Sequence, residues 1–205
     1  MKRTIINITT ICILFAAISF NSCSQDTPKP ITANKDIAKL YNGVDVTPGK
    51  VYQIVSVENA VNGKMTDFAF LDNAGKKHSI LEVTKNNYAF LNFWGTWCPP
   101  CRKEIPDIIQ LQNELSNKLV VIGVAFERDI ENAKKKVTEF SEKNGINYIL
   151  FVIDGELKVK INETYNGINA VPTTYIVDKS NDIFEKIVGS QSKDEFMATI
   201  KKMMK

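Results

Sequence analysis

The sequence predicts an α/β domain, and three observations support this prediction. Short apolar runs at 88–94, 119–126 and 148–153 have the length of buried strands and are bounded by turn residues. Two segments with apolar residues at helical spacing separate these runs. A pair of strand-like runs and a helical segment follow them. Strands that alternate with helices in this order are typical of a sheet covered by helices.

The first elements of the domain are predicted to form an N-terminal β-hairpin extension. Residues 51–57 are rich in β-branched side chains and follow a Thr-Pro-Gly turn signal. Asn62-Gly63 is a strong two-residue hairpin signal, and the residues at 66–71 alternate as in a strand. After a further turn, residues 77–81 are predicted to return as a paired strand.

The remaining elements complete the α/β pattern. The run at 88–94 is predicted to be a central strand because it is short, aromatic and flanked by turn residues. The apolar residues at helical spacing are Ile105, Ile108, Ile109, Leu111 and Leu115 in the first helix, and Ala133, Val137 and Phe140 in the second. The second helix is expected over 130–144. The runs at 173–177 and 183–188 are predicted to be antiparallel strands, followed by a helix over the last dozen residues.

The composition excludes several classes of protein. The chain has 205 residues, with 26 Lys and Arg, 23 Asp and Glu, and 44% hydrophobic residues, as expected of a globular protein. A formal charge of +3 is too small to indicate a nucleic-acid surface. Four cysteines are too few for a disulfide scaffold, so their positions must indicate what they do.

The amino terminus has the pattern of a secretory signal. Lys2 and Arg3 give a positive start, and an apolar run at 11–20 is interrupted only by Ser19. Ten helical residues span about 15 Å, roughly half of the bilayer core, so the run is too short for a stable transmembrane helix. Removal of residues 1–22 leaves 24 basic and 23 acidic residues, a charge of +1, so charge steering is not expected.

The predicted signal ends in Ser22-Cys23, which resembles the lipobox of bacterial lipoproteins, where the cysteine is acylated and becomes the first residue. Phe20 stands where that motif usually has Leu. Lipidation of Cys23 would anchor the protein to a membrane, whereas ordinary cleavage would leave Cys23 as a free thiol. The expected location is the cell envelope, as an anchored lipoprotein that faces the periplasm or the exterior.

The predicted organisation has three parts. Residues 1–22 are a lipoprotein signal peptide, and residues 23–46 are a tether and an extension of uncertain structure. Residues 47–205 are the folded domain, with a core from about 66 to 205.

Cys98-Pro99-Pro100-Cys101 follows the first buried strand and opens a helix. In an exported chain this spacing indicates a redox-active pair. Two residues between the cysteines at a helix start bring both sulfurs within bridging distance. The unpaired N–H groups of that helix start stabilise a thiolate on the first cysteine. Pro99 suits the first turn, where a missing N–H costs nothing.

Other interpretations of the pair fit less well. Zinc needs about four ligands, and beyond the pair the processed chain offers only Cys23 and His78, which is expected to be exposed. Covalent haem attachment needs a histidine directly after the second cysteine, where Arg102 stands. A peroxiredoxin-type peroxidase usually has Thr or Ser three residues before its reactive cysteine, where Gly95 stands. A structural disulfide across so short a loop would constrain little of the unfolded chain.

Two segments resemble a known family. Residues 92–106, NFWGTWCPPCRKEIP, closely resemble the active-site segment of TlpA/ResA-like thiol–disulfide oxidoreductases. Residues 171–178, VPTTYIVD, resemble the cis-proline segment of the same family. The resemblance covers roughly 66–205 and implies a thioredoxin-like three-layer α/β/α sandwich with the β-hairpin as an N-terminal extension.

The resemblance also implies roles for individual residues. Cys98 corresponds to the exposed attacking thiol and Cys101 to the buried resolving thiol. Pro172 corresponds to a cis-proline that faces the disulfide, rather than an ordinary trans proline in a turn, and lets the Val171 backbone bind an extended substrate segment. Trp97 is expected on the substrate-facing surface together with Pro99.

Glu104 has two interpretations. It lies three residues after Cys101, on the same helical face, where an acid in this family is thought to move protons for the cysteine pair. The alternative is a surface glutamate that stabilises the helix dipole. Asn92 stands where thioredoxins proper carry a buried aspartate, and an amide cannot transfer a proton, which favours the first interpretation.

The resemblance implies an exported, membrane-tethered thiol–disulfide oxidoreductase with no metal and no cofactor besides the Cys98–Cys101 disulfide. The expected substrates are disulfides of exported proteins, with apocytochrome c among them, and a membrane thiol–electron donor would recharge the pair. Nucleic acid is not an expected partner. The alternatives are a thiol oxidase or disulfide isomerase of secreted proteins, or a substrate-binding lipoprotein that uses the fold as a docking surface.

Overall fold

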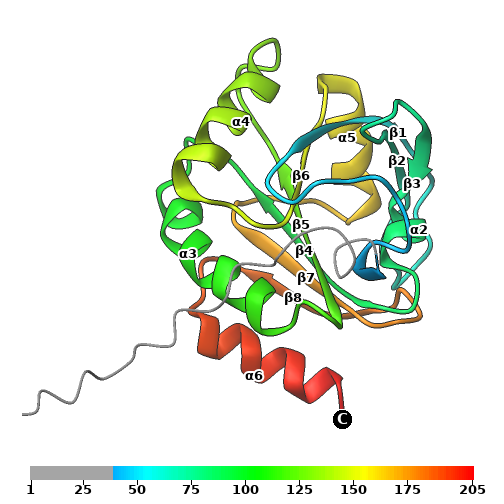
Figure 1. The fold of residues 1–205 in the computed structure, drawn as a ribbon, viewed down its shortest axis with the longest axis vertical. Helices are drawn as coiled ribbons and strands as arrows, with labels where there is room; N and C mark the ends of the chain where they lie inside the picture. The colour runs from blue at the N-terminus through cyan, green and yellow to red at the C-terminus, as the bar shows by residue number, and fades with distance from the viewer. Residues whose placement is uncertain (1–38) are drawn as a thin grey trace, which may run out of the picture.

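The computed structural model describes residues 39–205 (Figure 1). The predicted signal peptide at 1–22, Cys23 and most of the predicted tether lie outside these residues. Among residues 39–205, none of the helices combines the length and the hydrophobicity that a membrane-spanning helix needs.

The molecule is built on one mixed sheet of eight strands, in the order β3-β2-β1-β6-β5-β4-β7-β8. The strands are β1 (Val51–Val57), β2 (Phe68–Leu71), β3 (Lys77–Ser79), β4 (Tyr88–Trp94), β5 (Leu119–Ala125), β6 (Ile149–Val152), β7 (Thr173–Val177) and β8 (Ile183–Val188). The central strands β1, β6, β5 and β4 run parallel, and both flanks are antiparallel. Of these, β4, β5 and β6 are almost wholly buried, which explains their continuous apolar runs.

Helices cover both faces of the sheet, as Figure 1 shows. They are α2 (Ile80–Thr84), α3 (Pro99–Glu114), α4 (Ala133–Asn144), α5 (Gly155–Thr164) and α6 (Lys193–Met203). Buried residues of α3, α4 and α6 share one core cluster, and those of α2 and α5 share the other. The predicted three-layer α/β/α arrangement is therefore confirmed.

The N-terminal extension is part of the main sheet, because β1 pairs in parallel with β6 and antiparallel with β2. The predicted two-residue hairpin at Asn62-Gly63 is wrong, since a loop of ten residues joins β1 to β2. This loop pairs with the turn between β7 and β8 instead. Met65 N donates to Asn181 O at 2.9 Å, and Ile183 N donates to Gly63 O at 2.7 Å.

Residues 39–46, which were predicted to belong to an extension of uncertain structure, contribute to the core. Leu40, Tyr41, Val44 and Val46 are buried in the cluster that lies under α2 and α5. The packed part of the chain therefore begins before residue 47.

Two further expectations are corrected. The strand predicted at 77–81 ends at Ser79, whose side chain accepts a hydrogen bond from Leu81 N at 3.0 Å and starts α2. His78 was expected to be exposed, but only 8% of it is exposed. Its ring nitrogens contact Asp72 at 3.0 Å and Glu82 at 2.8 Å.

Candidate active site

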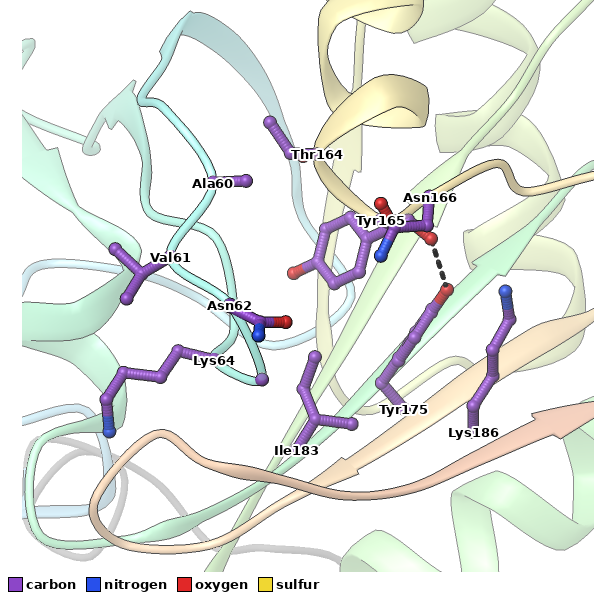
Figure 2. A pocket seen from close by; sticks show the side chains of 11 residues that line it. Ala60, Val61, Asn62, Lys64, Thr164, Tyr165, Asn166, Tyr175, Ile183 and Lys186 are labelled. Carbon is purple, nitrogen blue, oxygen red and sulfur yellow. Dashed lines mark hydrogen bonds between the residues drawn. The ribbon is translucent and has the colours of Figure 1, made fainter.

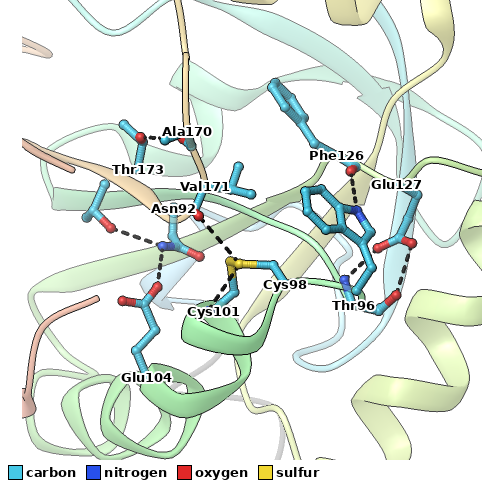
Figure 3. Close-up of a disulfide and its surroundings, with 12 residues drawn as sticks. Asn92, Thr96, Cys98, Cys101, Glu104, Phe126, Glu127, Ala170, Val171 and Thr173 are labelled. Carbon is cyan, nitrogen blue, oxygen red and sulfur yellow. Dashed lines mark hydrogen bonds between the residues drawn. A yellow bond between two sulfur atoms is a disulfide. The ribbon is translucent and has the colours of Figure 1, made fainter. Parts of the chain in front are cut away.

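The cysteine pair lies where β4 ends and α3 begins, at the edge of the sheet where open α/β sheets bind their ligands (Figure 3). Cys98 and Cys101 form a disulfide, with Cα atoms 5.3 Å apart. Cys98 is the N-cap of α3, and its sulfur accepts a hydrogen bond from Cys101 N at 3.3 Å. Pro99 stands in the first turn, as expected. The helix start therefore supports negative charge on the Cys98 sulfur.

Cys98 is less accessible than the resemblance implied. In the disulfide form it is 2% exposed and Cys101 is 0% exposed. The Cys98 Sγ lies 3.5 Å from Val171 O and faces the first turn of α3, which together cover it. The expected difference between an exposed and a buried cysteine is thus absent from the oxidised protein.

The Val171–Pro172 peptide bond is cis, as the resemblance implies. It comes directly before β7, which pairs antiparallel with β4, with Thr173 opposite Phe93. This register places Val171 beside the end of β4, where the disulfide begins. Strand pairing rather than proximity in sequence therefore brings residues 98 and 171 together.

Glu104 is buried under the disulfide, so its interpretation as a surface residue is wrong. It is 1% exposed, and its Oε1 accepts a hydrogen bond from Asn92 Nδ2 at 3.0 Å. Asn92 Nδ2 also donates to Thr174 Oγ1 at 3.0 Å. Burial raises the pKa of Glu104 to about 7, although hydrogen bonds from Asn92 and from the Gln191 backbone oppose this shift. A carboxyl group with that pKa can give or take a proton near neutral pH.

The loop before Cys98 is held by residues that follow β5, which sequence reasoning missed. The Glu127 carboxylate, 6% exposed, accepts from Thr96 N at 2.7 Å and from Thr96 Oγ1 at 2.9 Å. Trp97 Nε1 donates to Phe126 O at 3.0 Å. The available signal was an acidic residue directly after a buried parallel strand, at the same edge of the sheet as the cysteines.

The two tryptophans beside the pair differ in exposure. Trp94 is 1% exposed and packs in the core. Trp97 is 38% exposed, and the Arg128 guanidinium lies 4.0 Å from its ring centroid. Trp97 therefore presents an aromatic surface next to the disulfide, stabilised by a cation–π contact.

A cavity of about 550 Å³ lies away from the disulfide, between the β1–β2 loop, the end of α5 and the β7–β8 hairpin (Figure 2). Tyr165 and Tyr175 line it, and Tyr175 Oη donates to Tyr165 O at 3.4 Å. Its lining includes neither cysteine, nor Glu104, nor Val171. Residues 39–205 contain no group of three His, Cys, Asp or Glu side chains that could hold a metal ion.

Comparison with known proteins agrees with this geometry. Residues 61–186 match the model of the AhpC/TSA family. The chain is 38% identical over 129 residues to the thioredoxin-like protein YneN of Bacillus subtilis, covering 63% of this chain and 72% of that protein. It is 34% identical over 137 residues to the thiol-disulfide oxidoreductase ResA of Bacillus thuringiensis, covering 67% of this chain and 75% of that protein.

A solved structure shows the same arrangement of elements. A thiol:disulfide interchange protein of the thioredoxin family from Chlorobium tepidum aligns with a TM-score of 0.57 at 29% sequence identity. The alignment covers 72% of this chain and all of that one.

Proposed function

The chain belongs to the AhpC/TSA family and is a thiol–disulfide oxidoreductase, and from this premise we propose that it reduces disulfides of exported proteins from a membrane anchor. The observation that carries the proposal is the Cys98–Cys101 disulfide at the start of α3, beside the cis Val171–Pro172 bond and above buried Glu104.

The exchange proceeds in two displacements. The Cys98 thiolate attacks one sulfur of the substrate disulfide, forming a mixed disulfide and releasing the first substrate thiolate. The Cys101 thiolate then attacks Cys98 Sγ, which releases the second substrate thiolate and leaves the intramolecular disulfide. Two electrons pass to the substrate, and the two protons of the enzyme thiols are available to the product thiols.

Glu104 handles one of those protons in this proposal. Cys101 must lose its proton before the second displacement, and Cys101 is wholly buried from water. Glu104 lies one turn further along α3 and has a pKa of about 7, so its carboxylate can accept that proton near neutral pH.

The direction of electron flow is tested by the reduction potential of the pair, measured against a dithiothreitol or glutathione series. A reductant has a value near that of thioredoxin, about −270 mV, whereas a value near −120 mV would indicate a thiol oxidase and contradict the proposal. Replacement of Cys12 and Cys23 by serine confines the titration to Cys98 and Cys101.

The substrates are tested by trapping. A Cys101→Ser variant cannot complete the second displacement, so it should accumulate mixed disulfides through Cys98 that mass spectrometry identifies. We propose exported proteins with exposed disulfides as substrates, with apocytochrome c among them, and a membrane thiol donor as the source of electrons. Capture of cytoplasmic proteins alone would contradict this proposal.

The membrane anchor rests on Cys23 and is tested separately. Lipidation predicts a membrane-bound protein whose N-terminal peptide carries acyl groups on Cys23, detected by mass spectrometry. Cys23→Ser should move the protein to the soluble fraction, whereas Cys12→Ser is the matched control. A Cys23→Ser protein that stays with the membrane would contradict the anchor.

A further inference from the structure

A second, smaller cavity lies beside the disulfide loop. It has a volume of about 260 Å³ and is formed between the residues after β5, helix α5 and the segment that leads to Val171. Its lining residues are Phe126, Gly155, Lys158, Val159, Asn162 and Ile168.

Two of the residues that line this cavity lie close to residues of the redox site. Phe126 O accepts the hydrogen bond from Nε1 of Trp97, the residue before Cys98. Ile168 lies three residues before Val171, whose carbonyl is 3.5 Å from the Cys98 sulfur. Phe126 and Ile168 belong to one core cluster, and Val171 packs against it. The backbone that lies against Cys98 therefore packs on the same cluster as two residues of the cavity lining.

Exposed apolar side chains gather around the cavity. Val159 is 59% exposed, Ile130 is 45% exposed and Trp97 is 38% exposed. A Cβ atom at Gly155 would lie 3.4 Å from Ile130 Cδ1, which places Ile130 at the rim, and Trp97 is joined to the Phe126 wall. Apolar side chains that cluster on a surface around a hollow indicate a binding site rather than chance exposure.

A cation, Lys158, is among the residues that line the cavity. Lys158 Nζ lies 5.0 Å from the Phe126 ring centroid and donates a hydrogen bond to Glu127 O at 3.4 Å. Burial lowers the pKa of Lys158, although the negative charge of Glu127 opposes this shift. The Glu127 carboxylate itself is occupied by Thr96, and no carboxylate of residues 39–205 forms an ion pair with Lys158. An acidic group of a partner would complement this charge.

We propose that the cavity is a substrate subsite, which receives one apolar side chain of the segment that carries the target disulfide, with an acidic residue of that segment facing Lys158. The inference rests on the proposed reductase function and adds a substrate preference to it. The apolar lining, the exposed apolar rim and the unpaired cation together define this preference.

The test measures how fast the reduced full-length protein reduces disulfide-linked dimers of single-cysteine peptides, followed by the loss of enzyme thiols. One peptide series varies the two residues before the cysteine and the two residues after it. Each of these positions carries Leu or Ser in turn. A second series adds Asp or Lys next to the preferred Leu. At one of these positions, the peptide with Leu should be reduced about tenfold faster than the peptide with Ser, as expected for burial of one apolar side chain. Asp should react several-fold faster than Lys.

Variants at the rim locate the preference. Val159→Glu should reduce the preference for Leu to less than twofold, whereas Val61→Glu, at a site 60% exposed in the β1–β2 loop, should retain it. Lys158→Met should abolish the preference for Asp, and Lys160→Met should keep it.

Bis(2-hydroxyethyl) disulfide separates the subsite from the underlying chemistry, because it has no side chain to enter the cavity. All four variants should reduce it at the wild-type rate. The subsite is overturned if the wild type discriminates less than twofold between all peptides, or if the preference for Leu survives Val159→Glu. Failure of the wild type to reduce bis(2-hydroxyethyl) disulfide would overturn the reductase function, and the subsite with it.

Discussion

Glu104 is a carboxylic acid in a buried environment that disfavours its charged form. A carboxyl group that is 1% exposed is costly to ionise, and only uncharged donors, Asn92 and the Gln191 backbone, stabilise its charge. Among residues 39–205 no lysine or arginine forms an ion pair with it. The protein therefore maintains, directly under its disulfide, an acid that is half protonated near pH 7.

This environment predicts how stability depends on pH. The Glu104 pKa rises from 4.5 in the unfolded chain to about 7 in the folded protein, so the folded state binds more protons between these values. The free energy of unfolding should therefore fall as the pH rises from 4.5 to 7, by up to about 3 kcal/mol. Urea denaturation between pH 4.5 and 8 measures it, and Glu104→Gln should remove most of this fall. An unchanged pH dependence in Glu104→Gln would contradict the assignment.

Glu127 holds Thr96 in the loop before Cys98, so we expect it to act as a positioning residue. Glu127→Ala removes both acceptors of Thr96, and we expect the rate of disulfide exchange to fall about tenfold, the equivalent of one lost hydrogen bond. Glu127→Gln keeps an acceptor for Thr96 N and offers a donor to Thr96 Oγ1, so it should restore most of the rate. Stopped-flow reduction of a small disulfide measures both variants. A Glu127→Ala protein as fast as the wild type would exclude the role.

At the scale of elements, β5 supports the site by passing close to its neighbours. Gly123 pairs with Asn92 in β4 and with Leu150 in β6. A Cβ atom at this position would lie 2.7 Å from Leu150 Cδ2 and 3.0 Å from Trp94 Nε1, on the face that α3 covers. The absence of a side chain in the middle of this strand leaves room for the Trp94 ring.

Gly123→Ala should therefore destabilise the protein by about 1–3 kcal/mol, because the core has to shift to accept one methyl group. Gly155→Ala is the matched control. Its Cβ atom would meet only Ile130 Cδ1, at an ordinary 3.4 Å, and the change should stay below about 1 kcal/mol. Chemical denaturation measures both. Equal stabilities of the two variants would contradict the close packing at Gly123.

The elements also show what could be predicted from the sequence. The strands of the central sheet and α3 were predictable because each is long or strongly apolar and has clear end signals. Helix α5 was not predicted, because Val159 is exposed and of its residues only Ile161 is buried, which leaves a weak helical pattern. The hairpin signal Asn62-Gly63 was misleading because Gly63 and Met65 bond to the β7–β8 turn, more than 100 residues away. A local pattern cannot report such distant partners.

In the candidate site too, some features were predictable from the sequence and others were not. Cys98, Cys101, Pro172 and Glu104 were found because two local motifs contain them. The burial of Glu104 and the contact of Glu127 with Thr96 depend on which strands are neighbours, so they could not be predicted from one segment. The low exposure of Cys98 likewise results from Val171, which β7 brings beside it.

At the scale of the whole molecule, the N-terminal segment is part of the structure that holds the site. β1 covers the edge of β6 that would otherwise be unpaired, and residues 40–46 close the core over that part of the sheet. Tyr41 is 1% exposed in this cluster, on the opposite face of the sheet from the disulfide. The domain should therefore unfold as one cooperative unit that includes residues 39–57.

Tyr41→Ala tests whether the N-terminal segment and the rest of the domain unfold together. Loss of a buried aromatic side chain should reduce the free energy of unfolding by about 3 kcal/mol, with a single transition by tryptophan fluorescence and by circular dichroism. Val61→Ala, at a site 60% exposed, should change it by less than about 0.5 kcal/mol. Two separate transitions in the wild type would show that the N-terminal segment folds apart from the redox domain.

The central claim is that Cys98 attacks the substrate disulfide, and the reduction of insulin disulfides above the uncatalysed dithiothreitol rate tests it most directly. Wild type, Cys98→Ala and Cys23→Ser should be compared at equal concentration. We expect Cys98→Ala to be no faster than dithiothreitol alone, whereas Cys23→Ser should equal the wild type. A Cys98→Ala protein that still accelerates insulin reduction would contradict the mechanism.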